Sequence, residues 1–181
     1  MKKVFVLGVL ASAVVFSSVT SANSGTINFT GTITSATCTI SPVVGGNSVA
    51  SSIDLGNPGT DLTGAKTVSF SLKPVGAGSN DCLAKTQADV SWSAAAMDPV
   101  GLANSGGSAT GVSLELKAKN AANGEVTVTD SNRTVNYGSN ATGAAALTDF
   151  QYEAKLIKTI TSGTVTAGDF KSSASYTVAY K

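Results

Sequence analysis

The chain has 181 residues and no histidine. Without an imidazole it lacks the usual general base at neutral pH, the Ser-His and Cys-His nucleophile pairs, and most zinc-enzyme ligand sets. Charged residues are scarce, at 13% of the chain, and 12 Lys plus Arg nearly balance 11 Asp plus Glu. A nucleic-acid binder needs clustered cations, so this balance argues against nucleic acid as a partner.

Aromatic residues make up only 6% of the chain and there are four prolines, yet hydrophobic residues reach 42%. That hydrophobic content is too high for a disordered chain and predicts a packed core. The aspartates are scattered singly, and no spacing singles out an acid-base pair. No Gly-rich phosphate loop or metal-ligand cluster accompanies them. We therefore expect no enzymatic activity and no cofactor.

Long apolar runs are also missing, and no segment reaches the roughly 20 residues of a transmembrane helix. The apolar run from Val4 to Phe16 follows Lys2 and Lys3 and precedes a small, polar stretch that ends at Ala22. This order predicts a secretory signal peptide over residues 1–22. We expect the rest of the chain to be exported through the periplasm and to form one domain.

Alternation of apolar and polar residues dominates the remaining chain. Segments rich in Val, Ile, Thr and aromatics predict strands, and these segments are Thr26–Ile40, Thr67–Val75, Ala88–Ser93, Gly111–Lys119, Glu125–Thr129, Thr134–Tyr137, Thr148–Thr159 and Asp169–Tyr180. Turn residues separate them, and Asn123-Gly124 predicts a hairpin with a type I′ turn. Together they indicate an all-β sandwich of about seven short strands.

Two cysteines, Cys38 and Cys82, are an even number in an exported chain. The oxidising compartment predicts a disulfide between them. A free-thiol catalyst is the alternative, and it is disfavoured because no histidine is present to activate a thiolate.

The two ends of the exported chain carry amphipathic strands. At the N-terminal end one face holds mainly apolar residues and glycines, namely Gly25, Ile27, Phe29, Gly31 and Ile33. At the C-terminal end one face holds Phe170, Ala174, Tyr176, Val178 and Tyr180. The chain stops at Lys181 without a polar tail to cover this last strand, so we expect an uncovered edge.

Several residues together resemble the pilin subunits of chaperone/usher fimbriae, most closely a major subunit of enterobacterial type. They are the first strand INFTGTITSATC over Ile27–Cys38, the second cysteine at Cys82, Gly168 at the fourteenth position from the end, and the penultimate Tyr180. On pattern alone, the N-terminal alternation favours an ordinary first strand of a complete sandwich. The C-terminal features favour the pilin interpretation.

The resemblance implies an incomplete immunoglobulin-like sandwich that lacks its last strand and is completed by donor-strand exchange. Residues 1–22 would be the signal peptide, 23–33 a donor-strand extension and 34–181 the pilin domain. The acceptor groove would lie along the strand that follows Gly168. A periplasmic pilus chaperone would fill this groove first, and at the outer-membrane usher the extension of an identical or related subunit would replace it. The product would be a cell-surface fimbrium that serves adhesion to the host.

A second function is open under the same resemblance: the major subunit could itself bind a host glycan. Arg133 is the only arginine, and with Lys117 or Lys119 it could hold the carboxylate of a sialylated or other acidic sugar. An ordinary solvated loop arginine is the simpler interpretation of this residue.

Overall fold

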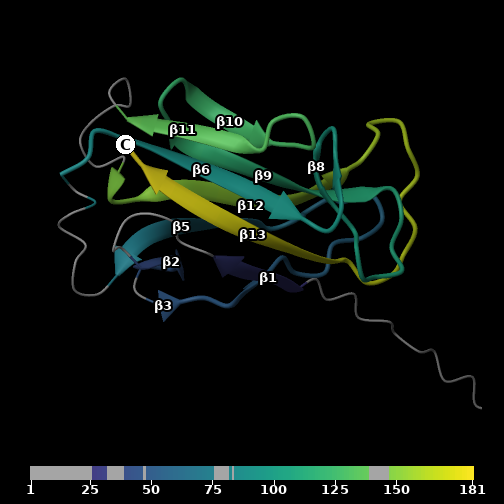
Figure 1. The fold of residues 1–181 in the computed structure, drawn as a ribbon. Helices are drawn as coiled ribbons and strands as arrows, with labels where there is room; N and C mark the ends of the chain where they lie inside the picture. The colour runs from purple at the N-terminus through teal and green to yellow at the C-terminus, as the bar shows by residue number, and fades with distance from the viewer. Residues whose placement is uncertain (1–25, 32–38, 47, 76–81, 83, 139–146) are drawn as a thin grey trace, which may run out of the picture.

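The computed structural model describes residues 26–31, 39–46, 48–75, 82, 84–138 and 147–181 (Figure 1). The predicted signal peptide, residues 1–22, lies outside them and stays a prediction. Within the described residues, no helix is long and apolar enough to cross a membrane.

The described chain is all-β, and its strands form two sheets. The smaller sheet has five strands, in the order β11 (Thr134–Gly138), β6 (Gln87–Ala94), β13 (Lys171–Tyr180), β1 (Thr26–Gly31) and β4 (Ser52–Asp54). Its pairings are antiparallel except that β1 runs parallel to β13. The last strand therefore lies inside the sheet, between β6 and β1 (Figure 1).

The larger sheet has eight strands. Seven follow the order β3 (Ser48–Val49), β2 (Thr39–Val44), β5 (Thr67–Val75), β12 (Phe150–Lys158), β9 (Val112–Ala121), β8 (Gly101–Ala103) and β7 (Met97–Asp98). The eighth, β10 (Gly124–Val128), pairs with β9 on the edge that β8 also uses. All of its pairings are antiparallel.

Aromatic side chains from both sheets meet in the core. Trp92 of β6 packs edge-on against Tyr152 of β12, with ring centroids 5.1 Å apart, and its indole Nε1 donates a hydrogen bond to the Tyr152 hydroxyl at 3.2 Å. Phe70 of β5 stacks on Tyr152 at 5.5 Å and also contacts Trp92 edge-on at 6.5 Å. Burial raises the pKa of Tyr152, because the phenolate would be desolvated there. The two inner faces thus form the single core of an incomplete immunoglobulin-like sandwich.

The strand prediction was right for the long segments and wrong in detail. Four short strands were missed: β3, β4, β7 and β8. Strands of two or three residues contain too few positions to show alternation, so only their pairing reveals them. The expected first strand, Thr26–Ile40, is divided between β1 and β2, and residues 32–38 lie outside the described chain.

The hairpin between β9 and β10 is present, but the predicted type I′ turn is wrong. Ala121 pairs with Gly124, so the two residues between the strands are Ala122 and Asn123. Gly124 has a positive φ of 94° whereas Asn123 does not, and the register shifts between Gly124 and Val126. A type I′ turn needs positive φ at both central residues, so this hairpin instead has a glycine bulge after the turn.

Candidate functional site

The last strand, β13, presents one face to the core. The buried side chains are those of Ser172, Ala174, Tyr176 and Val178. Phe170, just before the strand, is also buried, and Tyr180 at its end is half-buried. Lys171, Ser173 and Ser175 are exposed on the opposite face. These are the two faces expected from the alternation.

Tyr176 connects β13 to the other sheet. Its hydroxyl donates a hydrogen bond to the carbonyl oxygen of Ile40 in β2 at 2.9 Å. Its ring lies 5.7 Å from that of Trp92. The hydrogen bond and the ring contact fix the ring in the core beneath the centre of β13.

The edge of β13 that the sequence predicted to be uncovered is paired within the same chain, so that expectation is wrong for this structure. β1 pairs with β13 on one side and with β4 on the other. It fills the place of the strand that the sandwich otherwise lacks. The same chain carries both segments, which makes their local concentration high. We call the space between β13 and β4, which β1 occupies, the acceptor groove.

The register of β1 is set by its backbone pairing. Counted along β13, Ile27 lies opposite Ser172, Phe29 opposite Ala174 and Gly31 opposite Tyr176. Of the other predicted donor residues, Gly25 and Ile33 lie outside the described chain.

The start of β13 is held by Asn104, in the loop between β8 and β9. The Asn104 Nδ2 group donates to the carbonyl oxygens of Ala109 and Asp169, at 2.8 and 3.0 Å. Its Oδ1 accepts from the backbone N–H groups of Gly107 and Lys171, at 2.9 and 3.0 Å. One amide side chain thus clamps the β8–β9 loop onto the beginning of the acceptor groove.

Two glycines allow this close approach. A Cβ on Gly107 would lie 1.8 Å from the carbonyl oxygen of Asp169, and one on Gly168 would lie 2.5 Å from the backbone nitrogen of Ala109. Both distances are shorter than real Cβ atoms approach a backbone atom, so a larger residue at either position would force the backbone to shift. Gly168, which the resemblance singled out, therefore serves backbone packing next to the groove.

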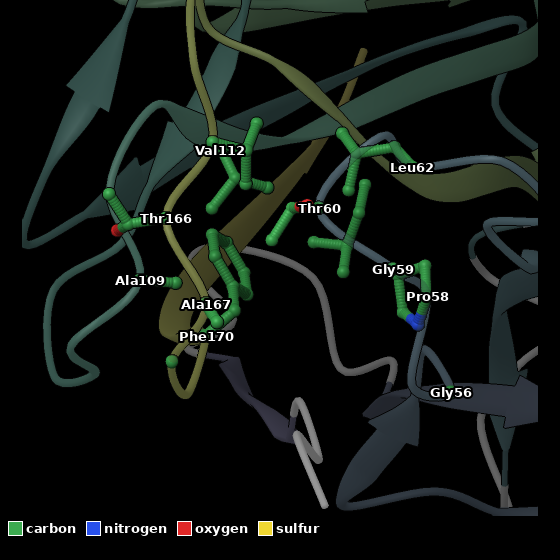
Figure 2. A pocket seen from close by; sticks show the side chains of 13 residues that line it. Gly56, Pro58, Gly59, Thr60, Leu62, Ala109, Val112, Thr166, Ala167 and Phe170 are labelled. Carbon is green, nitrogen blue, oxygen red and sulfur yellow. The ribbon is translucent and has the colours of Figure 1, made fainter. Parts of the chain in front are cut away.

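A small apolar pocket of about 40 Å³ opens beside Gly168 and Phe170. In Figure 2 the side chains of Leu62, Val112 and Phe170 converge on it from three separate segments. Leu62 has a positive φ of 59°, a conformation that costs a leucine about 1–2 kcal/mol. The volume suits the tip of one apolar side chain and is too small for a sugar. The sequence showed no sign of this pocket because its walls come from distant loops.

The all-β fold agrees with a comparison to known families. The family described as fimbrial protein matches residues 27–181, which is most of the chain. The chain belongs to the fimbrial protein family. It is a structural fimbrial subunit of the cell surface and not an enzyme.

Two relatives from Escherichia coli support this assignment. The fimbrial subunit is 41% identical to the K99 fimbrial protein over 188 aligned residues, which cover 99% of each chain. It is 32% identical to the F107 fimbrial protein over 161 residues, covering 88% of each chain.

The residues considered for glycan contact are distributed as follows in the fimbrial subunit. Arg133 is exposed on the loop before β11, and its Nε donates to the carbonyl oxygen of Asp130 at 3.0 Å. Lys117 forms an ion pair with Glu115 at 3.4 Å. Lys119 pairs with Glu125 and, at 3.3 Å, with Glu153, and these contacts raise its pKa. Carboxylates of the chain itself thus engage both lysines, and glycan contact by these residues stays a prediction.

The cysteines fit a structural role in the fimbrial subunit. Cys82 is completely buried and is not a free thiol. Cys38 lies outside the described residues, so its pairing with Cys82 stays a prediction. The described residues contain no cluster of three or more side chains that could hold a metal ion.

Proposed function

We propose that this fimbrial subunit polymerises by donor-strand exchange. Residues 23–33 of one subunit would enter the acceptor groove of the next and take the place of β1. One observation carries the proposal: the N-terminal strand pairs on both of its sides with β13 and β4, and so completes the smaller sheet. Adding a strand to a sheet supplies backbone hydrogen bonds and covers apolar side chains at the same time.

The same groove accounts for the proposed partners. An empty acceptor groove would expose the edge of β13 and the apolar side chains beneath it, which invites aggregation. A periplasmic chaperone that lends a strand would prevent this, and an outer-membrane usher would be the site of exchange. The fimbria built in this way would serve adhesion to the host.

Phe29→Asp tests the role of the donor strand. We expect the variant to accumulate as a complex with its chaperone and to form no fibres, because a charge would have to enter the apolar groove. Asn28→Asp is the matched control, since the neighbouring residue of a strand lies on the other face. Copurified chaperone and surface fibres counted by electron microscopy are the measurements.

Val178→Asp should block fibre formation at an earlier step than Phe29→Asp does. Val178 is buried in the subunit's own core, so we expect loss of the chaperone complex as well as of fibres. Fibres of normal number from Phe29→Asp, or equal loss of chaperone binding by Phe29→Asp and Val178→Asp, would contradict the proposed division between donor and acceptor.

A further inference from the structure

The turn between β9 and β10 contains the only Asn-Gly pair of the sequence, Asn123-Gly124. Asn123 is exposed, and so is Asn57 in the loop after β4. Within the described chain, neither of these two side chains forms a hydrogen bond. Other asparagines of the described chain donate hydrogen bonds from their amides, namely Asn104, Asn120, Asn132 and Asn136. The amides of Asn123 and Asn57 are therefore the ones free to react.

The residue that follows an asparagine decides whether its amide can react with the main chain. Pro58, which follows Asn57, has no backbone N–H. Gly124, which follows Asn123, has an N–H and no Cβ. No atom of the described chain lies within 4 Å of the point where a Cβ of Gly124 would be. The Gly124 nitrogen thus has open access to the side-chain carbon Cγ of Asn123.

We propose that Asn123 is a site of spontaneous deamidation in the assembled fimbria. The Gly124 nitrogen attacks Cγ of Asn123, the Cγ–Nδ2 bond breaks, and the Gly124 amide proton leaves with the Nδ2 group as ammonia. Water then opens the resulting succinimide ring at one of its two carbonyl carbons. Cleavage of the new N–Cγ bond gives aspartate. Cleavage of the original peptide bond gives isoaspartate, whose main chain passes through Cγ. The reaction needs only the folded subunit and water, so it is independent of donor-strand exchange.

The turn is connected by hydrogen bonds to the end of β13. The backbone N–H of Ala122 donates to the carbonyl oxygen of Asn136 at 2.8 Å, and the Asn136 Nδ2 group donates to Asp89 at 2.8 Å. Asp89 forms an ion pair with Lys181. All four residues line one hollow of about 170 Å³. Isoaspartate adds one carbon atom to the main chain next to Ala122, so it should move the Ala122 N–H away from Asn136.

The product also adds a negative charge that gains no ion pair on β9. The two lysines of this strand are already paired, Lys117 with Glu115 and Lys119 with Glu125 and Glu153. The new carboxylate therefore finds no free lysine on the strand that leads into the turn. We expect deamidation to weaken this end of the subunit.

Peptide mapping of purified fimbriae tests the modification. Trypsin cuts after Lys119 and Arg133 and releases one peptide that holds Asn120, Asn123 and Asn132. After incubation of intact fimbriae we expect deamidation at Asn123, and a faster reaction at alkaline pH because the attacking nitrogen must lose its proton. Asn120 must first break two hydrogen bonds, so it should react about thirtyfold more slowly. Electron-transfer fragmentation distinguishes aspartate from isoaspartate, and fimbriae digested without incubation are the control.

Two variants test whether the Asn-Gly pair is the cause. Asn123→Gln keeps a side-chain amide but requires a larger ring, so position 123 should stay unmodified. Pro58→Gly gives Asn57 a following glycine, so it should start deamidation at Asn57, which stays unmodified in the parent. Equal rates at Asn120 and Asn123, or an unmodified Asn57 in Pro58→Gly fimbriae, would overturn the inference.

Amide hydrogen exchange measures the effect on the fold. Loss of its hydrogen bond to Asn136 should make the Ala122 N–H exchange about fivefold faster in incubated fimbriae than in fresh ones. Asn123→Asp adds the charge without lengthening the main chain, so it should retain more of this protection. Unchanged exchange at Ala122 after complete deamidation would overturn the connection between the turn and β13.

Discussion

At the scale of single residues, Ser172 and Tyr176 differ in whether their buried hydroxyl groups have a hydrogen-bond partner. Both are buried on the inner face of β13, but only the Tyr176 hydroxyl has a hydrogen-bond partner in the described chain. The satisfied hydroxyl of Tyr176 joins β13 to β2, whereas the unsatisfied hydroxyl of Ser172 destabilises the folded subunit. Under the proposed strand exchange, this local instability would favour release of β1, because a fully satisfied groove would release β1 more slowly.

Ser172→Ala tests this at the residue scale. Removing the unpaired hydroxyl should increase the free energy of unfolding of the isolated subunit by about 1–3 kcal/mol. Ser173→Ala, the exposed neighbour on the opposite face, should change it by less than about 0.5 kcal/mol. Urea unfolding of both variants measures the difference. A Ser172→Ala subunit less stable than the parent would show that the hydroxyl has a partner.

At the scale of elements, the β8–β9 loop and the start of β13 depend on each other. Asn104 contacts both, and Gly107 and Gly168 let the two backbones approach closely. The small apolar pocket lies against this junction. A disturbance in the loop should therefore reach the acceptor groove, although the loop lies some 60 residues earlier in the sequence.

Gly107→Ala is expected to break this junction. The added Cβ would lie 1.8 Å from the Asp169 carbonyl oxygen, so the loop or the start of β13 must move, at a cost of about 1–3 kcal/mol. Gly106→Ala is a matched control, because its Cβ would meet Lys171 Cβ at an ordinary 3.5 Å. Thermal unfolding and amide exchange at Lys171 are the measurements. Equal stability of the two variants would contradict the junction's importance.

At the scale of the whole molecule, burial of the tyrosine hydroxyl groups makes the stability of the fold depend on pH. Burial raises the pKa of Tyr137, Tyr152 and Tyr176, and it raises the pKa of Tyr180 to about 12. The Tyr180 hydroxyl donates to the carbonyl oxygen of Leu147 at 3.3 Å, a bond that requires the neutral phenol. The fold thus favours the protonated form of all four.

Alkaline pH should therefore unfold the subunit. A raised folded-state pKa adds stability that is complete below the unfolded tyrosine pKa of about 10 and is lost as the pH rises toward about 12. Tyr180→Phe should make this loss less steep, because one titrating group is removed. Urea unfolding at a series of pH values between 8 and about 12 measures the slope. Identical slopes for the parent and Tyr180→Phe would contradict the effect of Tyr180.

Much of this protein is readable from alternation in its sequence. The inner residues of β13 and the long strands β5, β6, β9 and β12 follow from a period of two, because burial of one face of a strand is a local pattern. The resemblance to pilins, based on the two ends and the cysteines, was confirmed by the family match.

Only the tertiary structure decided which strands meet and in which direction. Alternation is the same for a parallel and an antiparallel neighbour, so nothing in Thr26–Gly31 predicts pairing with β13 of the same chain. The clamp of Asn104, the unpaired hydroxyl of Ser172 and the pocket near Phe170 depend on segments far apart in the chain. Such features arise because long-range packing, and not local residue order, determines which polar groups find partners.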